Sequence, residues 1–188
     1  MRQILNKPLW ALGLMSGTSA DGIDAALIQT DGITANAFGP THYVPYPKTL
    51  RNQILKAYGR PPGSEETLLE RVITEHHADV IFALLEKAQL TPSEVDLVGF
   101  HGQTLFHKPP RQKGEIGETH IIADGPLLAS LTDIPVIDQF RLNDVAHGGQ
   151  GAPLVPIFHQ ALSQDLPKPI AILNIGGVAN VTWIGAEE

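Results

Sequence analysis

The first segment whose residues could do chemistry is a turn of small and hydroxyl residues followed by two carboxylates. Residues 15–24 read Met-Ser-Gly-Thr-Ser-Ala-Asp-Gly-Ile-Asp. Small residues let backbone N–H groups approach a polyanion, and the hydroxyls of Thr18 and Ser19 could donate to phosphate oxygens. Asp21 and Asp24 would need a cation between themselves and a phosphate, which indicates Mg²⁺, bound directly or through water. A tight turn capped by Asp and Ser is the structural alternative, and composition alone favours it.

No Gly-Lys-Ser/Thr comes after this turn, which argues against a P-loop NTPase. A second glycine-rich turn, residues 174–180, reads Asn-Ile-Gly-Gly-Val-Ala-Asn. Paired glycines such as Gly176 and Gly177 are what a tight hairpin requires, so this signal is weak by itself. It gains weight because the first glycine-rich turn also joins two strand-length apolar runs.

Two further segments place polar groups where ligands gather in α/β folds. His101 and Gln103 come directly after a predicted buried strand, and they could hydrogen-bond a sugar or an amide; a histidine satisfied within its loop is the alternative. Residues 138–153 put charged and amide groups in a glycine-rich loop before a predicted helix, which is typical of an anion or polar-ligand site. Three charged residues of that loop could instead pair with one another: Asp138, Arg141 and Asp144.

The elements that position these segments can be predicted from hydrophobic patterning. Short apolar runs and extended segments predict seven strands: Leu9–Leu14, Ile23–Ile28, Ala35–Tyr46, Val95–Phe100, Val136–Ile137, Ile170–Ile175 and Val178–Ile184. Four helices are predicted between them: Thr49–Tyr58, Ser64 to about Leu90, Gly125–Thr132 and Pro153–Ser163. In the long helix two i,i+4 rows make one broad buried face: Leu68, Val72, His76, Val80, Leu84, and Leu69, Ile73, His77, Ile81, Leu85.

This order predicts an α/β fold with a mixed sheet, because helices separate parallel strands while the leading hairpin is antiparallel. A fresh hairpin near residue 170 suggests a duplicated architecture of which only the first half is complete. We therefore expect the sequence to be a fragment. In that case the last hairpin would lack a sheet and expose an apolar edge formed by Ile170, Ile172, Val181 and Trp183, and the isolated chain would be poorly soluble.

Composition narrows the function classes. Of 188 residues, 43% are hydrophobic and 18% charged, which is typical of a globular protein and ample for one domain. The formal charge of −7, without a Lys/Arg run, argues against a nucleic-acid or anionic-membrane partner. The absence of cysteine excludes a disulfide scaffold, thiolate zinc sites and a cysteine nucleophile. Without a visible signal peptide or membrane span, we expect a cytoplasmic protein.

Four segments together resemble the anhydro-N-acetylmuramic acid kinase family, in the family's order. They are residues 15–24, His101-Gly-Gln-Thr104, the run Asp144-Val-Ala-His-Gly-Gly-Gln-Gly-Ala-Pro-Leu-Val-Pro156, and residues 174–180. The resemblance implies the fold of actin, Hsp70 and the sugar kinases, an actin-like ATPase (ribonuclease H-like) fold in which two related domains clamp ATP. Residues 1–168 would form the first domain, and residues 169–188 the first hairpin of an incomplete second one.

The resemblance also implies an activity. The family uses ATP and Mg²⁺ to phosphorylate 1,6-anhydro-N-acetylmuramic acid at O6 while water opens the anhydro bridge, which gives N-acetylmuramic acid 6-phosphate for cell-wall recycling. The ATP phosphates and Mg²⁺ would meet the first loop and the second turn: Gly17, Thr18, Ser19, Ala20, Asp21, Gly22, Ile23, Asp24, Gly176 and Gly177. Mg²⁺ would be held by Asp21 and Asp24. The amino-sugar would meet His101, Gln103, Asp144 and Gln150.

The same resemblance leaves two gaps. The family's catalytic aspartate lies in a Gly-Phe-Asp-x-Gly-Pro-Gly-Asn segment beyond residue 188, so we expect no catalytic base here and an inactive chain, with Asp144 serving the sugar or its loop. Residues 121–123, Ile-Ile-Ala, replace the family's usual Gln-Ile-Gly, which would weaken a sugar contact. A non-catalytic binding half and a related kinase for another sugar stay open as alternatives, as does a homodimer.

Overall fold

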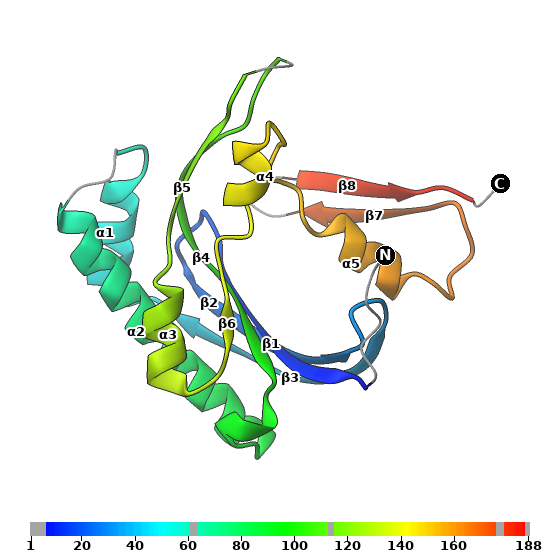
Figure 1. Ribbon diagram of the computed structural model, residues 1–188, viewed down its shortest axis with the longest axis horizontal. Coiled ribbons are helices and arrows are strands. Elements are labelled where there is room, and N and C mark those ends of the chain that lie inside the picture. Colours follow the sequence, from blue (N-terminus) through cyan, green and yellow to red (C-terminus); the bar gives the residue numbers. More distant parts are fainter. Residues whose placement is uncertain (1–6, 61–63, 113–114, 176–178, 187–188) are drawn as a thin grey trace.

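The computed structural model describes residues 7–60, 64–112, 115–175 and 179–186, with the backbone alone at 64–66. One mixed sheet of six strands forms its centre (Figure 1). Its strands are β1 (Leu9–Ser16), β2 (Gly22–Thr30), β3 (Ala35–Pro45), β4 (Leu97–Lys108), β5 (Glu118–Ile122) and β6 (Val136–Ile137). The order along the sheet is β3-β2-β1-β4-β5, and β6 also pairs with β4. The predicted α/β class and mixed sheet are confirmed.

The directions in which neighbouring strands pair explain why the sheet is mixed. β1, β2 and β3 form an antiparallel meander, as their short connections require, whereas β1 and β4 are parallel and are joined through helices. The first half of β4 pairs in parallel with β6, and its second half pairs antiparallel with β5. β4 therefore extends well past Phe100, where the sequence predicted its end, and β5 is a strand that hydrophobic patterning missed.

The helices are α1 (Lys48–Ala57), α2 (Ser64–Ala88), α3 (Gly125–Thr132), α4 (Leu142–Ala146) and α5 (Pro156–Leu162), with a 3-10 turn at Pro92–Glu94. Figure 1 shows α1, α2 and α3 on one side of the sheet and α4 and α5 on the other. Two helices depart from expectation. Helix α4 was not predicted, and α5 begins at Pro156 rather than Pro153, because the residues before it form a loop held by side chains of the candidate site.

The core lies between α2 and the sheet. Ile73, Ile81 and Leu84 of α2 are fully buried, and the His77 ring packs on Phe100 of β4 with 4.8 Å between centroids. The predicted burial is wrong for one residue of the two rows, since Leu68 is 68% exposed. The buried face is centred on the row through Ile73, His77 and Ile81, and Leu68 lies outside it.

Strands β7 (Ile170–Ile175) and β8 (Ala179–Ile184) form a separate two-stranded antiparallel sheet, as predicted. Its outer face is strongly exposed at Leu173, Ile175, Val181 and Trp183. Ile170 and Ile172, expected on that face, are half-buried instead. They alternate onto the face whose Thr182 hydroxyl lies 2.9 Å from His159 Nδ1 of α5.

In the described part of the chain, no helix combines the length and apolar character needed to cross a bilayer.

Candidate functional site

The turn between β1 and β2 has a tightly defined backbone. Ala20 is buried with a φ of 49°, and its N–H donates to the Gly17 carbonyl at 3.0 Å. The Tyr46 N–H donates to the Asp21 carbonyl at 2.9 Å, which joins the end of the turn to β3. Gly22 has no room for a side chain, since a Cβ there would lie 2.4 Å from the Val44 carbonyl oxygen. The expected phosphate loop therefore has one well-determined conformation.

Three consecutive carbonyls of this turn each accept a hydrogen bond from a side chain of another element. Gln103 Nε2 donates to the Gly17 carbonyl at 3.1 Å. The Tyr58 hydroxyl donates to the Thr18 carbonyl at 2.9 Å, and Arg51 donates to the Ser19 carbonyl at 3.3 Å. Gln103 comes from β4, whereas Arg51 lies in α1 and Tyr58 is the residue directly after it.

The expected sugar contact by Gln103 is not what the structure shows. Its side chain is fully buried, and Nε2 also donates to the Tyr58 hydroxyl at 3.1 Å while Oε1 accepts from the Ser16 hydroxyl at 2.6 Å. Both amide protons are thus used within the protein. The physical reason is an extra residue in β4: Leu14 pairs with Phe100 but Ser16 with Gln103, which turns Gln103 to the same face as Phe100.

The two carboxylates expected to bind Mg²⁺ are exposed at the edge of this turn. A hydrogen bond from the Ser19 hydroxyl lowers the pKa of Asp21. Burial and the nearby charge of Asp21 raise the pKa of Asp24. A divalent cation would relieve that repulsion, and two carboxylates with the remaining positions filled by water and phosphate suit Mg²⁺. No group of three or more His, Cys, Asp or Glu side chains that could hold a metal occurs among the described residues.

On the other face of β4, His101 supports an arginine that the sequence analysis did not assign to the site. The Gly102 carbonyl can only accept, so His101 Nδ1, 3.0 Å away, carries the proton. His101 Nε2 then accepts from Arg141 Nη2 at 2.9 Å, and burial together with the Arg141 charge lowers the pKa of His101. Arg141 Nη1 donates to the Gly151 carbonyl at 3.0 Å. His101 is therefore a neutral acceptor that orients a cation.

Asp144 and Gln150 both shape the glycine-rich loop. Asp144 Oδ2 accepts from the Gly151 N–H at 2.7 Å, and a Cβ at Gly149 would lie 2.3 Å from the same carboxylate. Gln150 Nε2 donates to the Pro110 carbonyl at 3.1 Å, although both side chains remain exposed at the surface. Of the two roles expected for Asp144, the loop role is the one for which the structure supplies contacts.

The charged residues of this loop do not pair with one another in the described part of the chain. Asp138 accepts from the Gly125 N–H at 3.1 Å, at the start of α3, and no ion pair joins it or Asp144 to Arg141. Arg141 Nε is buried without a hydrogen-bond partner there, and burial lowers the pKa of the guanidinium. An arginine without a carboxylate next to a glycine-rich loop is suited to an anionic or strongly polar ligand.

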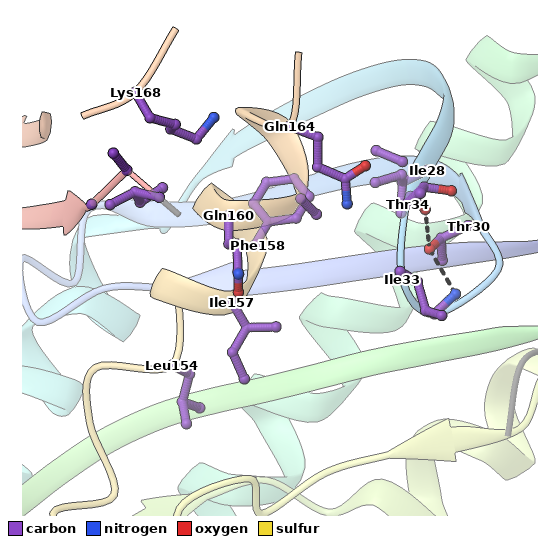
Figure 2. A pocket seen from close by; sticks show the side chains of 16 residues that line it. Ile28, Thr30, Ile33, Thr34, Leu154, Ile157, Phe158, Gln160, Gln164 and Lys168 are labelled. Atoms are coloured by element: carbon purple, nitrogen blue, oxygen red, sulfur yellow. Dashed lines mark hydrogen bonds between the residues drawn. The ribbon is translucent and has the colours of Figure 1, made fainter. Parts of the chain in front are cut away.

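Two remaining predictions concern residues outside this arrangement. Residues 121–123 are all buried, and the Ala123 N–H donates to Glu70 Oε1 at 2.9 Å, so their side chains pack in the core instead of lining the loop. Gly176 and Gly177 lie outside the described residues. A hollow of about 960 Å³ lies elsewhere, between the β2–β3 turn and α5 (Figure 2), and contains none of the predicted site residues.

Comparison with known proteins identifies the family of this chain. The sequence model described as anhydro-N-acetylmuramic acid kinase matches residues 9–188. The chain belongs to the anhydro-N-acetylmuramic acid kinase family. This family is part of the actin-like ATPase and sugar kinase superfamily, which confirms the resemblance and the fold expected from the four sequence segments.

Named relatives of the family give the extent of the match. The chain is 47% identical over 186 residues to the anhydro-N-acetylmuramic acid kinase of Gluconobacter oxydans (strain 621H), covering 96% of this chain and 49% of that protein. It is 49% identical over 181 residues to the kinase of the same name from Rhodospirillum rubrum, covering 94% of this chain and 46% of the relative. The chain thus spans about half the length of these curated relatives.

Sequence reasoning missed four residues of the arrangement. Arg51, Tyr46 and Tyr58 fell within or beside predicted elements. Arg141 was placed in a candidate ligand-binding loop, with pairing to nearby carboxylates as the alternative, but it was given no specific role. Only their meeting with the turn and with His101 in three dimensions distinguishes them. The one local sequence signal for this arrangement was the glycine that follows His101, because a glycine inside a strand often marks a bulge. In the structure Gly102 has a φ of 68° and lies at the irregularity in β4.

Proposed function

We propose that this chain supplies the first phosphate-binding turn and the sugar-side loop of an ATP-dependent carbohydrate kinase. The kinase phosphorylates 1,6-anhydro-N-acetylmuramic acid at O6 with hydrolytic opening of the anhydro ring, giving N-acetylmuramic acid 6-phosphate. The carrying observation is the fixed turn at Gly17–Ala20 with two exposed carboxylates directly after it, in a chain of this family. Such a reaction is a step of peptidoglycan recycling and belongs in the cytoplasm.

On the nucleotide side, backbone N–H groups of Gly17–Ser19 and the Thr18 hydroxyl meet the ATP phosphates. Asp21 and Asp24 would hold Mg²⁺, which when bound neutralises phosphate charge for phosphoryl transfer. The Ser19 hydroxyl holds the Asp21 carboxylate in the ionised form that this role requires. Residues 1–168 form the first actin-like domain, and residues 169–188, whose strands stand apart from the main sheet, begin the second.

On the sugar side, Arg141 is the leading contact, held by neutral His101 and the Gly151 carbonyl. Asp144 and Gln150 shape the loop and present their exposed side chains to the sugar. We assign Asp144 to the loop and the sugar rather than to the base, since its Oδ2 accepts the Gly151 N–H and so holds the loop. We expect the base in the family's Gly-Phe-Asp-x-Gly-Pro-Gly-Asn segment, which residues 1–188 do not contain.

A non-catalytic half that binds sugar or nucleotide without turnover is the second candidate. It is motivated by the absence of the family's Gly-Phe-Asp-x-Gly-Pro-Gly-Asn segment from residues 1–188. The coding sequence downstream of codon 188 distinguishes the two candidates. An in-frame Asp-x-Gly-Pro-Gly segment there favours the kinase, and a stop codon favours the binding half.

The test is product formation. Mg·ATP and 1,6-anhydro-N-acetylmuramic acid are added to the chain and to a longer protein carrying the second domain, and the 6-phosphate is measured by mass spectrometry. Product from the longer protein alone is expected. No product from either, or preference for another sugar in a substrate panel, contradicts the proposed substrate. Product from the 188 residues alone contradicts the placement of the base.

A further inference from the structure

The hydrogen bonds behind the first turn form a chain that runs in one direction. The Tyr46 hydroxyl donates to Ser16 Oγ at 3.0 Å, and Ser16 donates to Gln103 Oε1 at 2.6 Å. Gln103 Nε2 donates to the Tyr58 hydroxyl at 3.1 Å, and Tyr58 donates to the Thr18 carbonyl at 2.9 Å. Ser16 and Tyr58 each accept from the preceding group and donate to the next, so the orientation of the Gln103 amide is fixed.

Burial keeps the hydrogen bonds of this chain running in the same direction. Gln103 and Ser16 are buried, and burial raises the pKa of both Tyr46 and Tyr58, which keeps their hydroxyls protonated as donors. Reversing the Gln103 amide would set its oxygen against the Gly17 carbonyl, leaving two acceptors without a proton between them. The Gln103 donors therefore always face the turn.

Fixed carbonyls determine where the next amides point. In a planar trans peptide the N–H of one residue points opposite to the carbonyl of the residue before it. The Gly17 carbonyl points to Gln103 and the Thr18 carbonyl to Tyr58, so the N–H groups of Thr18 and Ser19 point away from these buried side chains. Two successive amides directed outward from a tight turn are suited to a phosphate oxygen.

We propose that Gln103 and Tyr58 are positioning residues for the phosphate-binding turn: they hold the Gly17 and Thr18 carbonyls inward so that the Thr18 and Ser19 amides face the nucleotide phosphates. The inference rests on the proposed function, and it assigns Gln103 to the nucleotide side although its sequence neighbour His101 serves the sugar side. The extra residue at Gly102 is the feature that divides β4 between these two tasks.

The test compares wild type with Gln103→Met, which keeps the shape of the side chain and removes both donors and the acceptor, and with Tyr58→Phe, which removes one hydroxyl. Gln53→Met on the exposed face of α1 is the matched control. Three quantities are measured on each protein, in the chain and in the longer protein: hydrogen exchange of the turn amides by NMR, and the affinities for Mg·ATP and for the anhydro-sugar by calorimetry.

We expect Gln103→Met to accelerate exchange at Ala20 and to weaken Mg·ATP binding about tenfold, while affinity for the anhydro-sugar is unchanged. Tyr58→Phe should give a smaller effect of the same sign, and Gln53→Met none. Unchanged Mg·ATP affinity in both Gln103→Met and Tyr58→Phe overturns the proposal. So does an exchange increase spread evenly over the whole sheet, which would mean a general loss of stability.

The design separates this inference from the function on which it rests. If wild type binds no Mg·ATP in either form, both the proposed nucleotide site and the phosphate role of Gln103 are wrong, and the exchange data then report only on the turn. If wild type binds and the variants bind equally well, the proposed function stands and the positioning role alone is refuted. Where Gln103→Met fails to fold, Tyr58→Phe decides, because it removes one hydroxyl and leaves the ring in place.

Discussion

Replacing the buried His77 should remove a large part of the protein's sensitivity to acid. The ring is fully buried against Phe100, its Nδ1 is held by the Ile73 carbonyl at 2.8 Å, and burial lowers the pKa to about 4 from 6.5. In the unfolded chain the same histidine has its ordinary pKa. The unfolded state therefore binds the proton first as the pH falls, and stability is lost progressively between about 6.5 and 4.

The magnitude is set by the size of the shift. Each pKa unit corresponds to about 1.36 kcal/mol, so the full effect of His77 is about 3 kcal/mol, of which about 2 kcal/mol is lost between pH 7 and pH 5. That is a large share of the roughly 5–15 kcal/mol typical of a domain. The charge of the neighbouring His76 acts in the same direction and also lowers the pKa of His77.

The assay is urea unfolding of wild type and His77→Leu at both pH values, with exposed His147→Ala as the control. The leucine variant should lose about 2 kcal/mol less than wild type between pH 7 and pH 5, because it lacks the buried ring whose pKa differs between the folded and unfolded states. The control should behave like wild type. Equal losses in wild type and His77→Leu would refute the assignment of acid sensitivity to this ring.

The turn and the last hairpin support three further predictions. Gly22→Ala should destabilise the protein by about 1–3 kcal/mol in urea unfolding, since its Cβ would lie 2.4 Å from a backbone oxygen. Gly13→Ala, with nothing within 4 Å of the added Cβ, should be near neutral. Equal effects of the two substitutions would contradict the packing argument. Asp21→Asn should raise the Mg²⁺ concentration for half-maximal kinase activity of the longer protein about tenfold or more, and unchanged Mg²⁺ dependence would rule out the metal role. Trp183→Lys, at a position 67% exposed on an apolar sheet face, should raise the solubility of the chain; a monodisperse wild-type monomer in sizing chromatography would contradict this expectation.

Local patterning predicted the elements well where one face is clearly apolar. The first hairpin, α3 and β6 lie where the sequence placed them, since Gly/Pro punctuation and alternation act within a few residues. β5 and α4 were missed because neither is amphipathic by itself. β5 exists because the second half of β4 offers it an open edge, and that edge is visible only in the assembled sheet.

The sequence predicted which segments form the candidate site but not how their side chains are arranged, and the binding roles themselves stay predictions. Residue types pointed to the turn before Asp21 and the loop around Asp144, although composition alone favoured an ordinary capped turn for the first; the match of four segments to one family raised the binding interpretation. The role of Gln103 could not be predicted, since one extra residue in β4 decides which face it occupies. The role of Arg141 could not be predicted either, because closeness in sequence to carboxylates does not show whether an ion pair forms.

The most direct test of the account is an NMR titration of the ¹⁵N-labelled chain with Mg·ATP. The account predicts saturable shifts that are largest at the amides of Thr18 and Ser19, with smaller changes at Asp21 and Asp24 and none in the hollow beside α5. The absence of saturable shifts, or shifts concentrated around Ile157 and Phe158 in that hollow, would contradict the claim that the β1–β2 turn is a phosphate-binding loop.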